Sequence, residues 1–295
     1  MLYFLALVCL STSPNWAKLN QMPAEVLGFW RLAIASFILI IFQIYKKDFK
    51  LIKPNKQNQW IFISGFFFFL HLWTYKYAAK HTLVSNTMVL FATNPIWSSV
   101  GSCFFFKDHI APRIYGAYTL AFTGIIYLVY NSLNFSPEQL QGNISALISA
   151  VFYAAYMLSG KKARENHSNK IYATYQYLTC ALLFFMVTLL NQQPFIENYS
   201  AVSWLAVMGL VALPTFLGHF LMTHLVKTMS LAILTCGKLI EPVIASFIAY
   251  FLFHETLSNS IYVSFSMTFL SVIILFWPQL KIFFQKFSKT ESIHS

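Results

Sequence analysis

Charge is scarce in this chain of 295 residues, and acidic residues are especially few. Asp, Glu, Lys and Arg together make up 10% of the sequence, whereas hydrophobic residues make up 58% and the mean hydropathy is +0.60. A soluble fold of this length cannot hide so many apolar side chains from water. The composition therefore excludes an ordinary soluble protein and predicts one that is embedded in lipid.

Other absences narrow the range of functions. The longest polar stretch is the basic loop 46–59, which is too short to form a soluble domain. The chain has no Walker-type glycine-rich loop, and this argues against ATP as the energy source. The four cysteines all fall inside apolar runs, so they indicate neither disulfides nor a cluster of metal ligands. We therefore expect neither a metal nor a cofactor.

Ten apolar segments can be laid along the chain, each long enough to cross roughly 30 Å of hydrocarbon as a helix. The first segment lacks the positively charged start of a secretory signal, so we expect it to be retained. The fold predicted is therefore an all-α membrane protein with ten transmembrane helices. The predicted spans are 2–18, 25–45, 60–79, 82–106, 112–131, 141–160, 171–190, 203–226, 230–253 and 259–278.

Basic residues are distributed unevenly among the loops. If the N-terminus is cytoplasmic, most of the 20 basic residues fall on the inner side, and the outer loops hold only Lys18 and Lys80. The positive-inside rule then predicts that both termini are cytoplasmic. We interpret the net charge of +11 as basic loops that lie against anionic membrane lipid, and not as nucleic-acid binding. Heavy use of Phe, Ile, Asn and Lys is typical of an AT-rich bacterial genome, so the expected location is the bacterial inner membrane.

Two stretches of the chain repeat each other at a constant offset of 147 residues. Asn94 and Pro95 correspond to Glu241 and Pro242. The same offset pairs Lys80 with Lys227, Ser99 with Ser246, and Asp108 with Glu255. Such an internal repeat, with polar and proline-broken segments inside apolar sequence, is typical of a two-fold membrane transporter.

An odd number of spans in each half has a geometric consequence. Five helices return the chain to the opposite side of the membrane, so the second half must be inverted. We predict a first five-helix repeat at 1–135 and a second, inverted one at 136–295, which ends in a short basic cytoplasmic tail. Inverted repeats of this kind place a substrate site at their interface, near the middle of the bilayer.

Two prolines are predicted to break spans four and nine at their centres. Pro95 and Pro242 lack an N–H group, so the carbonyls of Phe91 and Lys238 lose their helical partners and are expected to become available to solute or water. A packing kink at each proline is the structural alternative. Matched positions beside polar residues favour the functional interpretation.

An ordered set of residues now supports a family resemblance. The set comprises Phe29-Trp30-Arg31-Leu32-Ala33, Asn94-Pro95-Ile96, Lys107-Asp108, Leu239-Ile240-Glu241-Pro242-Val243-Ile244-Ala245 and His254-Glu255. With the ten-span layout, this set resembles the EamA family of the drug/metabolite transporter superfamily over essentially the whole chain. The resemblance implies a secondary transporter and not an enzyme. It leaves the solute open among amino acids, other carboxylates, amines, nucleotide-like metabolites and drugs.

Charged residues inside the spans are the sharpest local clues, because each costs about 2.5–3.5 kcal/mol at the centre of a helix. Glu241 is the one acidic residue that falls at mid-membrane, and a carboxylate there could exchange a proton during transport. Lys238 lies three residues earlier on the same helical face. It is predicted either to pair with Glu241 or to take a substrate carboxylate, and both can hold in one cycle.

Two further basic residues fall within the spans. Arg31 is predicted to contact an anion or, equally, to snorkel to the surface or cap neighbouring carbonyls. Lys76 lies so near the outer boundary that we expect it to snorkel to the surface. Together with Lys238 they outnumber Glu241, which favours an anionic or zwitterionic solute over a lipophilic cation.

Histidines and aromatic residues complete the predicted site. His71, His219 and His224 invite a metal hypothesis, but a spacing of five residues between the last two does not suit a shared helix face. We interpret His71 and His219 as hydrogen-bonded or pore-lining groups, with proton relay as an alternative. Trp97, Tyr153 and Tyr156 are the candidates for an aromatic cavity wall, which would suit a solute with a flat or apolar part.

The sequence therefore predicts a secondary transporter that works by alternating access on a small metabolite. Glu241 is the expected coupling acid, Lys238 and Arg31 the expected anion-binding groups, and Asn94 an expected hydrogen-bond donor. The alternatives are efflux of amphipathic cations with Glu241 as counter-ion and, without a supporting motif, a membrane-embedded enzyme. The expected partners are a small solute and membrane lipid, the chain being a monomer or a homodimer.

Overall fold

The structure is a computed structural model of the chain. It describes residues 1–53, 55–56, 58–107, 111–132, 137–197 and 199–254, and also 259–260, 262–264, 266–267, 269–271, 273–274 and 277. Several sequence predictions lie outside these residues. They concern Asp108, Glu255, the boundary between residues 135 and 136, and the C-terminal tail.

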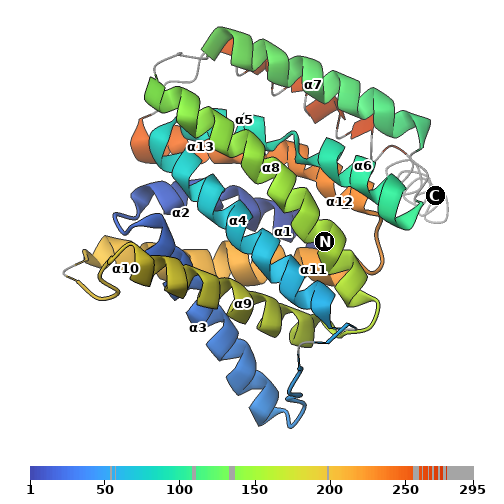
Figure 1. The fold of residues 1–295 in the computed structure, drawn as a ribbon. Helices are drawn as coiled ribbons and strands as arrows, with labels where there is room; N and C mark the ends of the chain where they lie inside the picture. The colour runs from blue at the N-terminus through green and yellow to red at the C-terminus, as the bar shows by residue number, and fades with distance from the viewer. Residues whose placement is uncertain are drawn as a thin grey trace, which may run out of the picture.

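Every regular element of the described chain is a helix, as Figure 1 shows, which agrees with the predicted all-α class. The helices are α1 (Leu2–Ser11), α2 (Ser13–Leu19), α3 (Ala24–Tyr45), α4 (Gln59–His81), α5 (Val84–Phe91), α6 (Asn94–Phe106), α7 (Pro112–Ser132), α8 (Pro137–Arg164), α9 (Asn169–Leu190), α10 (Ala201–Leu210), the π-helix η1 (Val211–Phe220), α11 (Leu221–Leu225), α12 (Leu231–Cys236), the 3₁₀-helix η2 (Gly237–Ile240) and α13 (Glu241–Phe253).

Proline explains why three of the predicted spans are divided into shorter helices. Pro14, Pro95 and Pro242 each occupy the first turn of a new helical segment, where the missing N–H costs nothing. Spans one, four and nine are therefore divided into α1–α2, α5–α6 and α12–η2–α13. Within the described residues, five helical segments are long and apolar enough to cross a membrane, so the ten-span prediction is supported in part.

The two halves of the chain carry matched elements. Helices α3 and α9 both have 22 residues, and α6 and α13 both have 13. Among the described non-glycine residues, left-handed backbone occurs at corresponding helix ends. These residues are Lys47 after α3, Gln192 after α9, Lys107 after α6 and His254 after α13.

The two proline-broken segments lie antiparallel. Helix α5 contacts α13, and α6 contacts α12. In Figure 1, α5 leads to α6 from left to right, whereas α12 leads to α13 from right to left. The two matched segments therefore cross in opposite directions, just below α7 in this view.

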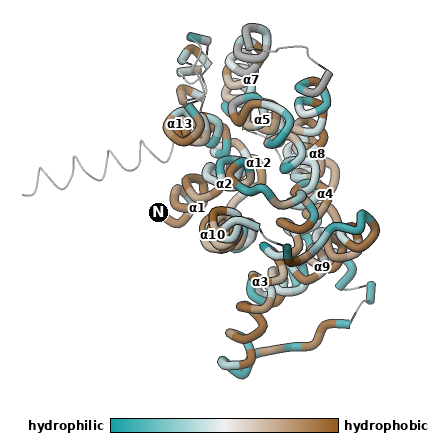
Figure 2. The backbone as a smooth tube through the Cα atoms, turned by 90° about the vertical axis from the view of Figure 1, so that its left-hand side faces the viewer, coloured by the Kyte–Doolittle hydropathy of each residue, from teal (hydrophilic) through white to brown (hydrophobic). Residues whose placement is uncertain are grey.

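Long helix pairs surround this crossing. Helix α4 packs along α8, α3 packs along α9, and α1 packs along η1. The outer surface carries large exposed hydrophobic side chains such as Phe37, Phe104 and Leu190, which are 62%, 82% and 79% exposed. In Figure 2 the tubes of α1, α3 and α13 are largely brown, the colour of hydrophobic sequence. An apolar exterior of this extent suits lipid contact.

Candidate functional site

A small cavity lies where the two broken segments meet. Its volume is about 20 Å³, room for about one water molecule and far below the roughly 300–1,000 Å³ of ligand pockets, so a solute can enter only after the walls move apart. Its walls come from α1, α2, α4, α5, α8, η1, η2 and α13, so both halves of the chain contribute. The lining residues are Leu10, Ser13, His71, Leu72, Tyr75, Phe91, Tyr153, His219, Lys238 and Glu241.

A buried ion pair stands in the cavity wall. The Nζ of Lys238 lies 2.6 Å from Oε1 of Glu241, and both side chains are 3% exposed. The 3₁₀ turn η2 followed by α13 places the two residues three positions apart on one face. Breaking such a pair by removal of one partner costs about 3–5 kcal/mol, because a buried charge is left uncompensated. The pair is thus the most strongly polar feature of the cavity.

Aromatic rings surround the ammonium group. The Nζ of Lys238 lies 4.6 Å from the ring centroid of Tyr153 and 5.5 Å from that of Phe91. Cation–π attraction in a desolvated site is worth about 2 kcal/mol. The two rings can therefore stabilise the ammonium group of Lys238 while the carboxylate of Glu241 binds another partner.

Two histidines from different halves of the chain meet beside the pair. The ring centroids of His71 and His219 are 6.2 Å apart. His71 Nδ1 makes a 2.8 Å hydrogen bond with the hydroxyl of Ser149, and its ring stacks on Phe91. His219 Nδ1 is buried and has no hydrogen-bond partner among the described residues. No group of three or more metal-ligand side chains occurs in the described part of the chain.

The backbone carbonyls at the two breaks are occupied, contrary to the prediction. The carbonyl of Phe91 accepts a 2.9 Å hydrogen bond from Nδ2 of Asn94, and the carbonyl of Lys238 accepts one from the backbone N–H of Glu241. In each break the residue before the proline satisfies the carbonyl that the proline leaves unpaired. These carbonyls are therefore not free to bind a solute.

Comparison with known proteins identifies the family. The sequence profile of the EamA-like transporter family matches residues 1–130 and again 140–277. The chain belongs to the EamA-like transporter family. The predicted transporter function is confirmed at this level, and the chain is not an enzyme by family.

Individual relatives are distant. An uncharacterized transporter in the trpA 3' region of Buchnera aphidicola subsp. Schlechtendalia chinensis is 24% identical over 199 residues, which is 65% of this chain and 63% of that relative. An S-adenosylmethionine uptake transporter of Rickettsia bellii (strain RML369-C) is 22% identical over 86% of this chain and 84% of its own length. One crystal structure superposes with a TM-score of 0.76 at 17% identity, covering 95% of this chain and 97% of the other, which shows a shared fold.

Other predicted site residues of this EamA-like transporter lie beside the cavity or away from it. Tyr156 is fully buried one ring behind Tyr153, with 5.4 Å between their centroids. Asn94 is buried, and its Oδ1 has no partner among the described residues, but it does not line the cavity. Trp97 is 46% exposed and does not line it either, so its assignment to the cavity wall was wrong.

Arg31 serves the neighbouring π-helix. Its Nε donates a 2.8 Å hydrogen bond to Oγ1 of Thr215, and that hydroxyl donates at 2.8 Å to the carbonyl of Leu210, five residues earlier in the chain. Its Nη2 is buried and has no partner among the described residues. Arg31 is 1% exposed and does not line the cavity, so any contact with a solute requires a rearrangement.

Lys76 does not snorkel to the surface. It is 1% exposed, its Nζ contacts the carbonyl of Ala24 at 3.4 Å, and it lies over the ring of Phe184 at 5.3 Å. Its neighbour Lys80 donates to the carbonyl of Met22. Both ammonium groups therefore bind backbone carbonyls at the start of α3. This structural role depends on contacts between helices, which hydropathy does not predict.

Sequence reasoning missed half of the cavity lining. Tyr75 lies one turn after His71 on α4, so the helical period could have identified it. Ser13 belongs to the polar run at the start of the chain. The sequence did not single out the ring of Phe91, because the prediction for this residue concerned only its backbone carbonyl. Leu10 and Leu72 are ordinary apolar residues in sequence and become informative only through their position.

Proposed function

We propose that this transporter carries a small zwitterionic metabolite with an α-amino-acid end across the bacterial inner membrane. In this proposal the ten spans form two inverted repeats, 1–135 and 136–295, which rock about the central cavity by alternating access. Both termini are cytoplasmic. The observation that carries the proposal is the buried pair of Lys238 and Glu241 inside the cavity wall.

The buried pair favours a solute that bears both charges. If a solute carboxylate takes Lys238 and a solute ammonium takes Glu241, each buried charge exchanges one partner for another. A solute with a single charge leaves one member of the pair uncompensated, at a cost of about 3–5 kcal/mol. Selection of a zwitterion then follows from charge balance inside the cavity.

The rest of the wall suits a flat or apolar group beyond the amino-acid end. The rings of Tyr75, Phe91 and Tyr153 face the same space as the imidazoles of His71 and His219. The buried Nδ1 of His219 and the hydroxyl of Tyr153 have no hydrogen-bond partners among the described residues. These two atoms are the polar contacts that we assign to the solute.

Efflux of amphipathic cations, the alternative function, receives less support. A cation that binds Glu241 must displace Lys238, whose Nζ lies 2.6 Å from the carboxylate. The displaced ammonium group then shares the same enclosed cavity with a second positive charge. A zwitterion avoids this repulsion because it supplies its own carboxylate.

The relative from Rickettsia bellii suggests a first substrate to test. It is named an S-adenosylmethionine uptake transporter. S-adenosylmethionine has an α-amino-acid end that matches the ion pair, an adenine that matches the aromatic wall, and a sulfonium whose additional positive charge would need cation–π contact with that wall. The cavity of about 20 Å³ must widen many-fold to hold it, so the solute binds in another state of the alternating-access cycle than the one seen here.

Proton coupling is part of the proposal. Protonation of Glu241 neutralises the carboxylate and frees Lys238 for the carboxylate of the solute. Because one carboxylate cannot hold the proton and pair with the solute ammonium at once, the proton leaves Glu241 when the ammonium arrives, and the two occupy Glu241 in successive steps of the cycle. An imposed pH gradient should then drive uptake.

Counterflow in proteoliposomes tests the proposed function. We expect preloaded S-adenosylmethionine or a smaller amino acid to accelerate entry of its labelled form, and a pH gradient to increase uptake. The panel also contains nucleotides without an amino acid and simple amines. Faster exchange of the amines than of every zwitterion would contradict the proposal and favour cation efflux.

Site-directed labelling tests the orientation. Glu197 lies in the exposed loop before α10 and Lys50 in the exposed loop before α4. An impermeant thiol reagent applied to intact cells should modify Glu197→Cys and should modify Lys50→Cys only after lysis. The reverse pattern would place both termini outside.

A further inference from the structure

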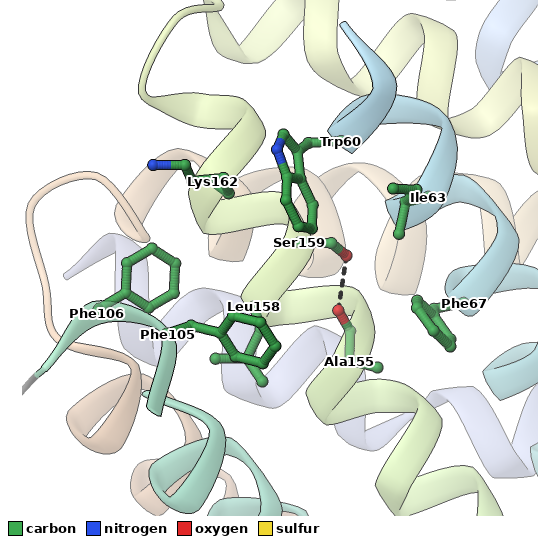
Figure 3. Close-up of a pocket in the computed structure, with 9 residues that line it drawn as sticks. All are labelled: Trp60, Ile63, Phe67, Phe105, Phe106, Ala155, Leu158, Ser159 and Lys162. Carbon is green, nitrogen blue, oxygen red and sulfur yellow. Dashed lines mark hydrogen bonds between the residues drawn. The ribbon is translucent and has the colours of Figure 1, made fainter. Parts of the chain in front are cut away.

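A second pocket lies between α4, α6 and α8, and it shares no lining residue with the central cavity. Its volume is about 240 Å³. Figure 3 shows the side chains that line it. They are Trp60, Ile63, Phe67, Phe105, Phe106, Ala155, Leu158, Ser159 and Lys162.

Most of this pocket offers no polar group to a ligand. The hydroxyl of Ser159 donates to the carbonyl of Ala155 at 2.6 Å, the bond drawn dashed in Figure 3, and also approaches the carbonyl of Tyr156 at 3.1 Å. The hydroxyl is therefore already satisfied by its own helix. Apart from Lys162 and the indole N–H of Trp60, the other lining side chains are hydrocarbon. Such a wall suits an acyl chain and not a polar metabolite.

The pocket reaches the outer surface of the helix bundle. Phe105 in its wall is 69% exposed, and Phe104 next to it is 82% exposed. Ile63 and Phe67 follow Trp60 along α4 at helical spacing, while Ala155 and Leu158 line the opposite side from α8. The eight residues from Ala155 to Lys162 span about 10 Å of helix. The pocket is thus a slot that runs along the helices and opens towards lipid.

Positive charge is concentrated at one end of the slot. Lys162 is part of the wall, and the Nζ of Lys161 lies 4.2 Å from the ring centroid of Phe106. Exposed Lys107 directly follows Phe106 in the chain. Lys162 pairs with Glu165 at 2.8 Å, but both side chains are nearly half exposed, so that pair contributes little. Among the described residues at this end, positive charge therefore prevails.

We propose that this slot binds an anionic glycerophospholipid of the cytoplasmic leaflet. One acyl chain lies between Phe67, Phe105 and Leu158, and the phosphate of the headgroup meets Lys162. Trp60 sits at the same end, where an indole suits the boundary between headgroups and hydrocarbon. The choice of leaflet rests on the proposed orientation, whereas the binding itself does not rest on the proposed substrate, because the central cavity is a separate site.

A lipid in the slot would contact three helices, α4, α6 and α8, which we expect to move during transport. Helix α6 carries the second half of the broken span, whereas α4 and α8 carry His71 and Tyr153 of the central cavity. A chain in the slot contacts all three helices at once. We therefore expect anionic lipid to stabilise the arrangement seen here.

Native mass spectrometry of the purified protein tests the proposal with phosphatidylglycerol and phosphatidylethanolamine added to detergent micelles. We expect tighter binding of phosphatidylglycerol, weakened about fivefold in Lys162→Gln, since one lysine near an anionic lipid contributes that much. Lys227→Gln is the matched control, because Lys227 is an exposed lysine that does not line the slot. It should leave binding unchanged.

A second variant tests the acyl chain separately from the charge. Ala155→Phe fills the slot and should abolish tight binding of phosphatidylglycerol, whereas Leu147→Phe at an exposed position of α8 should not. Helical content and thermal stability of each variant in detergent exclude misfolding as the cause. Equal binding of both lipids, indifference to Lys162→Gln and Ala155→Phe, or full competition by soluble glycerol phosphate would each overturn the proposal.

Discussion

Lys238 places its ammonium group 5.5 Å from the ring centroid of Phe91, the residue that stands 147 positions before it in the chain. Equivalent positions of the internal repeat therefore face each other. Three residues further on, the first half has Asn94, which caps a carbonyl, and the second half has Glu241, which forms an ion pair. The internal repeat gives the two halves equivalent positions around the cavity, whereas both charged side chains, Lys238 and Glu241, come from the second half.

The first prediction concerns the carboxylate. Glu241→Gln removes the charge-assisted bond to Lys238 and the proton-accepting group but keeps the shape of the side chain. Uptake should fall about 10- to 100-fold, the equivalent of one such hydrogen bond. Initial rates in proteoliposomes measure this, with the amount of inserted protein as control. Unchanged proton-driven uptake would remove Glu241 from the mechanism.

The second prediction concerns stability. Lys238→Met or Glu241→Gln alone leaves a buried polar group without its partner, whereas the double variant leaves no unpaired charge. Each single variant should lower the melting temperature in detergent. The double variant should lower it by less than the two single decreases added together. Additive losses would mean that the two side chains do not act as a pair in solution.

Much of the fold was predictable from sequence, because long apolar runs and matched prolines are local signals. The pair of Lys238 and Glu241 was predictable for the same reason, since three residues on a helix share a face. Arg31, Lys76 and Trp97 were harder, because their roles depend on neighbours from other helices. Sequence gives the depth of a side chain in the membrane but not the side of the helix that meets a partner.

The third prediction separates a structural residue from a binding residue. Asn94→Ala removes the hydrogen bond to the carbonyl of Phe91 and should destabilise the break by about 1–3 kcal/mol. We expect lower thermal stability together with a nearly unchanged KM for the solute. A large increase in KM at normal stability would instead place Asn94 in contact with the solute.

The fourth prediction concerns a close contact between the halves. A Cβ on Gly237 would lie 1.9 Å from the hydroxyl of Tyr3, and that hydroxyl donates to the carbonyls of Ile233 and Leu234. Gly237→Ala should therefore displace α1 from α12 and reduce both stability and transport. Tyr3→Phe in the same chain should restore part of the loss. A fully active Gly237→Ala would show that the two elements are not packed as described.

The most direct test of the central claim compares S-adenosylmethionine with its decarboxylated form in counterflow, in the native protein and in Lys238→Ala. If Lys238 receives the carboxylate of the solute, the native protein prefers the carboxylated form. The variant should lose that preference and carry the decarboxylated form at least as well. An unchanged preference in Lys238→Ala would contradict the account.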